Sequence, residues 1–106
     1  MRKEDIFLLL EKAEGFDWDE GNIDKNWKKH QVSNQETEEV FFNHPLLINL
    51  DKKHSSKKEI RFQVLGITNG GRRLFVVFTL RNNKIRIISA RDQNKKERRI
   101  YEKQKT

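Results

Sequence analysis

The sequence predicts an α+β domain in which an antiparallel β-sheet of about four strands packs against N-terminal helices and carries a C-terminal helix. Two changes of pattern predict this class. Before Pro45 the apolar residues recur with the spacing of a helix, and after it they alternate with the period of a strand. A charged helical pattern then closes the chain. Turn sequences separate the strands, so we expect consecutive strands to pair as antiparallel neighbours.

The first predicted helix covers residues 3–14, and its apolar residues fall on one stripe. Gly15 is placed to end this helix in a left-handed conformation. The alternation in residues 16–18 indicates a short N-terminal strand. The stripe consists of Ile6, Leu9, Leu10 and Ala13.

Two further helices are predicted in the first half of the chain. Asp19 is expected to cap a helix that runs through His30. Ser33 and Glu36 form a capping box at the start of the next helix, which the dipeptide His44-Pro45 ends. The apolar side chains that we assign to the core from this region are Trp18, Ile23, Trp27 and Phe41.

Four strands are predicted in the second half of the chain. Asn69-Gly70-Gly71 and Asn82-Asn83 are turn sequences that tolerate positive φ. Asn94 and Glu97 are expected to cap a last helix that runs through Tyr101 to the end of the chain. The predicted strands are Leu46–Leu50, Ile60–Thr68, Arg73–Arg81 and Lys84–Ala90.

The turns also predict which side chains meet on each face of the sheet. A three-residue loop between the second and third predicted strands would place Arg61 opposite Thr79 on the polar face, whereas a two-residue loop there would turn Arg61 inward. We expect the first arrangement because a buried, unpaired arginine is very costly. The other polar-face pairs expected are Arg81 with Lys84, Thr79 with Arg86, and Val77 with Ile88. The core face is expected to carry Val76, Phe78, Leu80, Ile85 and Ile87.

Length and composition exclude several classes of protein. The 106 residues are expected to form one domain (1–106), which is too short for a multidomain enzyme with its own cofactor domain. There is no cysteine, so no disulfide framework and no thiolate zinc site can form. No apolar run approaches the ~20 residues of a membrane span. We therefore expect a cytoplasmic protein that does not enter the membrane.

Charge divides the chain into two halves. The formal net charge is +7, but residues 1–60 carry ten basic and thirteen acidic side chains, whereas residues 61–106 carry thirteen basic and three acidic ones. Eight of the nine arginines lie in the second half. Because the planar guanidinium binds phosphate bidentately, this concentration favours phosphate or nucleic-acid recognition, although a solvated charged face is the structural alternative.

The order of motifs along the chain resembles the BrnT family of toxins. The C-terminal part of the resemblance is the run from Arg86 to Arg91 (Arg-Ile-Ile-Ser-Ala-Arg), followed by Glu97-Arg98 and Tyr101. Earlier matching positions include Phe16-Asp17-Trp18-Asp19, Asn26, Lys29-His30, Val32-Ser33, Val40-Phe41, Pro45, Asp51, His54-Ser55, Glu59, Arg61 and Gly66. Gln31 stands where the family commonly has glycine, Asp92-Gln93 replaces a basic or small pair, and residues 1–15 form a helical extension before a BrnT-like core of residues 16–101.

This resemblance implies a RelE-like fold and a ribonuclease toxin of a type II toxin–antitoxin system that inhibits translation and growth. It also implies a BrnA-like antitoxin with a ribbon-helix-helix DNA-binding domain, in a complex of two toxins and two antitoxins. Operator DNA would then be bound only through the antitoxin. The basic charge of this chain would serve RNA.

The residues themselves contain the groups that metal-independent RNA cleavage requires. The reaction needs a base for the 2′-hydroxyl, a cation for the phosphorane and an acid for the 5′-oxygen, and neither a metal nor a cofactor is expected. Structural roles compete for each candidate: Glu59 and Arg86 can form ion pairs, and Tyr101 can pack on the sheet. The catalytic candidates are His54, Glu59, Arg61, Arg86 and Tyr101. The RNA-binding candidates are Arg73, Arg81, Lys84, Arg91, Arg98 and Arg99.

Two other functions fit the same composition. The basic half alone would suffice for a non-catalytic RNA- or DNA-binding module. The arginines could instead only dock an acidic protein, which would make the chain an antitoxin-binding subunit. Cleavage of RNA separates the enzyme from both.

Overall fold

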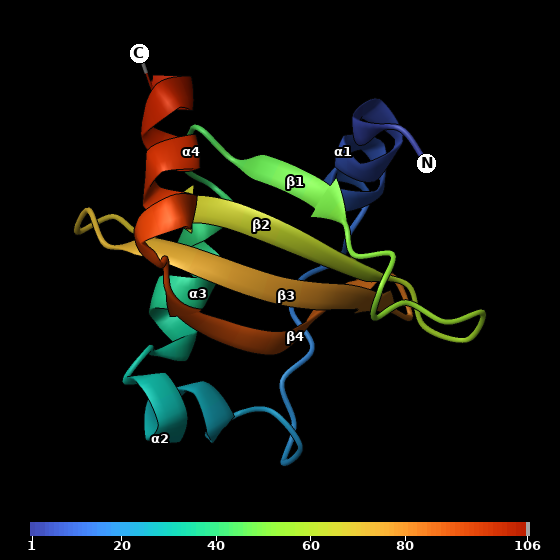
Figure 1. Ribbon diagram of the computed structural model, residues 1–106. Helices are drawn as coiled ribbons and strands as arrows, with labels where there is room; N and C mark the ends of the chain where they lie inside the picture. The colour runs from blue at the N-terminus through green and yellow to red at the C-terminus, as the bar shows by residue number, and fades with distance from the viewer. Residues whose placement is uncertain (106) are drawn as a thin grey trace.

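A single four-stranded antiparallel sheet, in the order β1-β2-β3-β4, forms the centre of the fold (Figure 1). The computed structural model describes residues 1–105, and the predicted α+β class is confirmed. The predicted last helix is also present, but residue 106 lies outside the described part. The elements are α1 (Lys3–Glu11), α2 (Lys25–His30), α3 (Asn34–Val40), β1 (Leu47–Leu50), β2 (Arg61–Ile67), β3 (Arg73–Arg81), β4 (Lys84–Asp92) and α4 (Lys95–Lys105).

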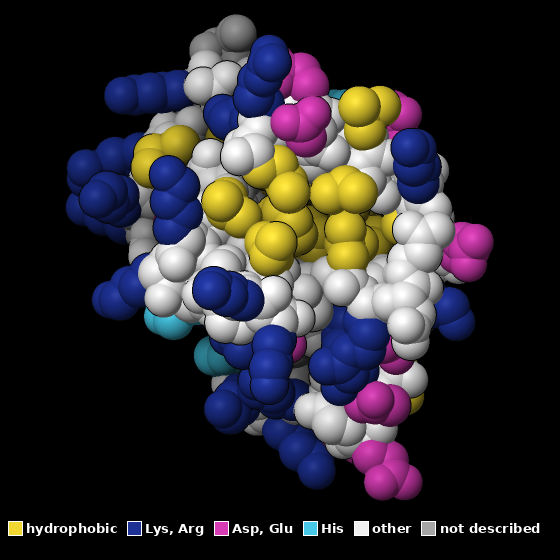
Figure 2. Space-filling view, turned by 90° about the vertical axis from the view of Figure 1, so that its right-hand side faces the viewer, with side chains coloured by type: hydrophobic (Ala, Val, Ile, Leu, Met, Phe, Trp, Pro, Cys, Tyr) yellow, Lys and Arg dark blue, Asp and Glu magenta, His cyan; other side chains and the backbone are white. Residues whose placement is uncertain are grey.

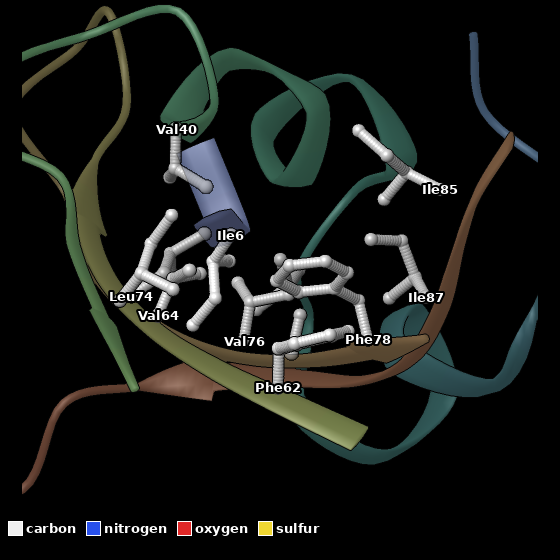
Figure 3. Close-up of a cluster of buried hydrophobic side chains, with 12 residues drawn as sticks. Ile6, Val40, Phe62, Val64, Leu74, Val76, Phe78, Ile85 and Ile87 are labelled. Carbon is white, nitrogen blue, oxygen red and sulfur yellow. The ribbon is translucent and has the colours of Figure 1, made fainter. Parts of the chain in front are cut away.

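The core lies between one face of the sheet and the helices α1 and α3, which Figure 1 shows behind the strands. Alternate residues of β2 and β3 point into it, as the strand period requires. Figure 3 shows Ile6 of α1 and Val40 of α3 meeting these side chains from the helical side. Every side chain predicted for the core face is buried or packed against the core: Val76, Phe78, Leu80, Ile85 and Ile87.

A glycine in β2 allows α3 to lie close to the sheet. A Cβ built on Gly66 would meet the Cβ of Val40 at 2.9 Å and the Val40 carbonyl oxygen at 3.4 Å. Since real Cβ atoms do not approach that closely, a larger residue would push the end of α3 away from the strand. Gly66 therefore sets the distance between the helical layer and the sheet.

The register of the strands confirms most of the predicted pairs. Arg61 lies opposite Thr79, Thr79 lies opposite Arg86, and Arg81 lies opposite Lys84. The predicted pair of Val77 with Ile88 is wrong, because a bulge between Val77 and Phe78 shifts the register and brings Ser89 opposite Val77. A bulge adds one residue to one strand, which an alternation pattern cannot reveal.

The ends of two predicted helices require correction. The helix predicted over 3–14 ends at Glu11, and Gly15, with φ 121°, turns the chain toward β4 instead of capping the helix. Phe16 then forms an isolated parallel bridge with Ile85 in place of the predicted short strand. The helix predicted from Asp19 begins only at Lys25, after a stretch of turns.

The side chains that α2 and the turn before it pack on the sheet are polar, which corrects the predicted core positions of Ile23 and Trp27. Ile23 and Trp27 are 42% and 58% exposed, whereas Asn22 and Asn26 are buried. The Asn22 amide donates to the carbonyls of Asp17 and Ile87, and Asn26 Oδ1 accepts from the backbone N–H of Ala90. These bonds satisfy backbone groups along β4 that an apolar helix face would leave unpaired.

Two predicted capping boxes are confirmed. Ser33 Oγ accepts from the backbone N–H of Glu36, and the Glu36 carboxylate accepts from the backbone N–H of Ser33. Asn94 and Glu97 exchange the same pair of bonds at the start of α4. No helix in the described chain has the length and apolar character that crossing a bilayer requires.

Candidate functional site

Four side chains form a row across the sheet, on the face opposite the core. The backbone N–H of Asp51 donates to the carbonyl of Arg61 at 2.8 Å, which continues the β1–β2 pairing by one residue. Arg61 pairs in turn with Thr79, and Thr79 pairs with Arg86. Paired residues project on the same side of a sheet, so we call this set the cross-strand row: Asp51, Arg61, Thr79 and Arg86.

A histidine, His54, is bound at the Asp51 end of the cross-strand row. Asp51 Oδ2 lies 3.0 Å from Nδ1 of His54, and Asp51 Oδ1 accepts from the backbone N–H of His54. Burial, which acts to raise the pKa of Asp51, is outweighed by hydrogen bonds from His54 and Gln63, so the pKa is lowered. An ionised carboxylate can only accept a hydrogen bond, so Nδ1 of His54 is the donor in this contact. The His54 side chain is 56% exposed and therefore accessible.

Arg61 is held through one side of its guanidinium only. Its Nε donates to Glu59 Oε1 at 2.8 Å, while neither terminal nitrogen donates a hydrogen bond to any of the described residues. Ser55 Oγ accepts from the backbone N–H of Arg61 and donates to the carbonyl of Asp51, which fixes the 51–60 loop against β2. Glu59 thus orients a guanidinium whose terminal fork remains available for a phosphate.

Arg86 is in a different state. Both terminal nitrogens of Arg86 donate to the Asp19 carboxylate, at 2.9 and 3.0 Å, and Asp17 lies 3.5 Å away. The Arg86 side chain is only 14% exposed. The hydrogen bond to Arg86 lowers the pKa of Asp19, and the reciprocal bond raises that of Arg86. The structural alternative considered for Arg86, an ion pair with the acidic part of the chain, is present.

Tyr101 is not part of the cross-strand row. It is fully buried, and its hydroxyl donates to the Pro45 carbonyl at 2.6 Å. Burial raises the pKa of this hydroxyl, with a smaller contribution from Glu102. Its position joins α4 to the segment that precedes β1, which is a packing role.

The predicted RNA-binding residues fall into two groups. Arg81, Lys84 and Arg99 are exposed. Arg91 forms a bidentate pair with Glu97 and lies 4.2 Å from the centre of the Phe75 ring. The other two are also held by the protein, since Arg73 pairs with Glu102 and Arg98 donates to the Gln93 carbonyl.

No group of three or more potential metal-ligating side chains occurs in the described part of the chain.

The most extensively bonded arginine was absent from the predicted set. Arg72 donates to Glu36, to Asp92 and to the carbonyls of His30 and Gln31. The hydrogen bond to Asp92 is the main cause that raises the pKa of Arg72. Arg72 therefore ties the helices α2 and α3 to the end of β4.

Sequence reasoning also missed two carboxylates that position candidate residues. Asp51 holds His54, and Asp19 holds Arg86. The first had a signal in the sequence. An aspartate often accepts a hydrogen bond from the backbone N–H a few residues later in a turn, and His54 follows Asp51 by three residues. The second had none, since Asp19 and Arg86 are 67 positions apart.

The fold and the cross-strand row define a small basic α+β domain in which one sheet face carries a half-exposed arginine, Arg61, and a carboxylate that holds His54. Residues 18–97, more than half of the chain, match the family described as the ribonuclease toxin BrnT of type II toxin–antitoxin systems. The chain belongs to this family, and membership implies ribonuclease activity and an antitoxin partner. No curated protein matches the chain significantly.

Proposed function

We propose that the chain cleaves single-stranded RNA without a metal at the Asp51 end of the cross-strand row. The observation that carries this proposal is the junction of Asp51 and Arg61, because it brings an oriented histidine and an open guanidinium to one edge of one sheet face. Metal-free RNA cleavage needs these two kinds of group together.

In the proposed reaction, Nε2 of His54 takes the proton of a ribose 2′-hydroxyl. The 2′-oxygen attacks the adjacent phosphorus, and the terminal nitrogens of Arg61 bind the developing charge of the phosphorane. The bond from phosphorus to the 5′-oxygen then breaks, and the leaving oxygen takes a proton from the protonated His54 or from water. The products are a 2′,3′-cyclic phosphate and a 5′-hydroxyl. Asp51 and Glu59 act as positioning residues for His54 and Arg61.

Two of the catalytic candidates have other roles in this proposal. Arg86 stabilises the row electrostatically while it stays bound to Asp19, and Tyr101 supports the fold because it has no exposed surface. The exposed Arg81 and Lys84, two pairs beyond Thr79 and Arg86 in the β3–β4 hairpin and on the same face, extend the phosphate-binding path. The exposed Arg99 on α4 binds RNA more distantly, and Arg73, Arg91 and Arg98 contribute through their net charge.

The proposal includes the partner and the fold family. A BrnA-like ribbon-helix-helix antitoxin, in a complex of two toxins and two antitoxins, neutralises the enzyme by covering the row and alone contacts operator DNA. The order of helices and the four-stranded antiparallel sheet support assignment to the RelE-like folds. The half-exposed Arg61, whose terminal nitrogens make no hydrogen bond among the described residues, supports an acidic antitoxin segment as the competitor of RNA.

The test is incubation of the pure chain with messenger RNA in EDTA, followed by gel electrophoresis and end-group analysis. We expect fragments that carry 2′,3′-cyclic phosphate ends. Cleavage that EDTA abolishes would disprove metal independence. Intact RNA that is retarded on the gel would support the non-catalytic nucleic-acid-binding module. Inertness toward RNA together with tight capture of the antitoxin would support the antitoxin-binding subunit.

A further inference from the structure

A cleft of about 380 Å³ lies beside the cross-strand row, between α1 and the segment that leads into β2. This volume is within the range of small-molecule sites, roughly 300–1,000 Å³. Glu59 and Thr79 line the cleft, and both contact the candidate site: Glu59 binds Arg61, and Thr79 belongs to the row. A molecule in the cleft would therefore be adjacent to a phosphate held by Arg61.

The lining of the cleft is mixed, with apolar side chains next to basic ones and one acidic side chain, Glu59. Its apolar lining includes Leu9 of α1 together with Ile60 and Leu80. Figure 2 views the side of the molecule on which α1 and the 51–60 loop lie, and shows a patch of hydrophobic side chains with Lys and Arg to its left and below it and with Asp and Glu above it. The basic residues that line the cleft are Lys57, Lys58 and Arg81, and all three are exposed.

The three basic side chains of the lining, which we call the basic rim, identify the occupant. Lys57, Lys58 and Arg81 are exposed and form no salt bridge with a carboxylate among the described residues, and Arg81 acts on Asp19 only weakly through its charge, so all three can bind an external anion. An apolar surface flanked by such charges complements a nucleotide, whose base presents an apolar face and whose flanking phosphates are anionic. A purely apolar partner, such as a hydrophobic helix, would leave the basic rim unsatisfied.

We propose that this cleft is a base-binding subsite, which receives one unpaired RNA base next to the scissile phosphate. Leu9 and Ile60 contact the base, and the basic rim binds the phosphates on either side. The wall that α1 supplies lies outside the family match at residues 18–97, so this chain's own N-terminal helix shapes the subsite. The inference rests on the proposed function, because it assigns a place to the RNA that the row cleaves.

The test compares two fluorescent oligomers, each with twelve 2′-O-methyl ribose phosphates so that neither can be cleaved. One carries bases of mixed sequence and the other is abasic, and binding is followed by fluorescence anisotropy. We expect the wild-type chain to bind the base-containing oligomer about tenfold more tightly than the abasic one. We expect Leu9→Gln to reduce this ratio to about twofold or less. Changing both Lys57 and Lys58 to Gln should weaken binding of both oligomers equally and leave the ratio unchanged.

Leu8→Gln is the matched control, because Leu8 is 53% exposed on the same helix and does not line this cleft. It should preserve the wild-type ratio, and thermal melting should show that both leucine variants remain folded. A wild-type chain that cleaves messenger RNA while Leu9→Gln keeps the full ratio overturns the subsite and leaves the proposed function intact. If Leu9→Gln no longer captures the antitoxin but keeps the wild-type ratio of base-containing to abasic oligomer binding, the cleft is a protein-docking surface. That result also overturns the subsite. A folded wild-type chain that neither cleaves nor binds RNA refutes both proposals.

Discussion

The carboxylate of Asp51 accepts two hydrogen bonds from a single residue, His54, one from Nδ1 of the ring and one from the backbone N–H. Asp51 is 6% exposed, whereas the His54 side chain is 56% exposed. A buried, ionised acceptor therefore fixes the orientation and the tautomer of an accessible imidazole. In the proposed reaction this relationship decides which ring nitrogen meets the substrate.

Replacing His54 should abolish most of the activity without unfolding the protein. We expect His54→Ala to lower the rate of RNA cleavage about 10²–10⁴-fold, which is the usual contribution of a general acid or base. Asp51→Asn should lower it less, because the imidazole remains but its tautomer is no longer selected. Single-turnover cleavage of a labelled RNA measures both. His44→Ala, at another exposed histidine, is the control, and equal activity of His54→Ala and His44→Ala would eliminate His54 as the catalytic base.

Arg61 and Arg86 should respond differently to replacement by alanine. Arg61 is partly exposed and bound through one nitrogen, so Arg61→Ala should cost activity while its ion pair contributes only about 0–1 kcal/mol of stability. Arg86 is nearly enclosed, and its removal leaves Asp17 and Asp19 without their cation, so Arg86→Ala should lower Tm more than Arg61→Ala does. Circular-dichroism melting and RNA cleavage of both variants separate the effects. A larger Tm loss for Arg61→Ala would contradict the assignment.

Gly66→Ala should destabilise the fold. The added methyl group would meet Val40 at 2.9 Å, and the nearby carbonyl belongs to the backbone of α3, which cannot move without disturbing the core. We expect a loss of about 1–3 kcal/mol in the free energy of unfolding, measured by urea denaturation. Gly70→Ala is the control, because its nearest neighbouring atom would be 3.9 Å away. Similar stabilities for the two variants would show that α3 is not held at this distance by Gly66.

Gln31→Gly should stabilise the protein. Gln31 ends α2 in the left-handed conformation, with φ 53° and ψ 37°, which costs a non-glycine residue about 1–2 kcal/mol. Glycine removes this cost but also raises the conformational entropy of the unfolded chain, which offsets part of the benefit. We therefore expect the free energy of unfolding to rise by a net amount of about 0.5–1 kcal/mol. Thermal and urea unfolding measure the change. Gln35→Gly, in the first turns of α3, should instead destabilise by about 1 kcal/mol, and stabilisation by both variants would point to a different cause.

Acid should weaken the fold through carboxylates that are ion-paired in the native state. The hydrogen bond from Arg72 lowers the pKa of Asp92 below its ordinary 3.8. Bonds from Arg91 and Asn94 outweigh burial and lower the pKa of Glu97 below 4.5. Since the unfolded chain then binds protons more readily than the folded one, this stabilisation is present above about pH 4.5 and is lost as the pH falls through the lowered native pKa values. Tm measured from pH 7 to pH 3 should fall at the acid end, and the fall should be smaller in Asp92→Asn. An identical acid dependence in that variant would exclude the Arg72–Asp92 pair as a source.

Much of the fold could be predicted because its signals are local. The capping boxes at Ser33 and Asn94 depend on residues three positions apart, and the two hairpins depend on turns of two and three residues. The turn lengths placed Arg61 and Arg86 on either side of Thr79. The prediction failed at α2, where Ile23 and Trp27 are exposed. Periodicity identifies an apolar face but not whether the neighbouring surface offers apolar side chains or backbone groups that need hydrogen bonds.

The sequence by itself determined the class of fold, the face of the sheet that carries the arginines, and the family, because periodicity, turn chemistry and motif order are written along the chain. Only the tertiary structure decided what each charged group does. It bound Arg86 to Asp19, bonded the buried Tyr101 of α4 to Pro45, and left the terminal nitrogens of Arg61 without a hydrogen bond among the described residues. An ion pair between distant residues depends on distance and burial, which the order of residues does not specify. For the same reason, identical arginines in one sequence became structural in one place and available to a phosphate in another.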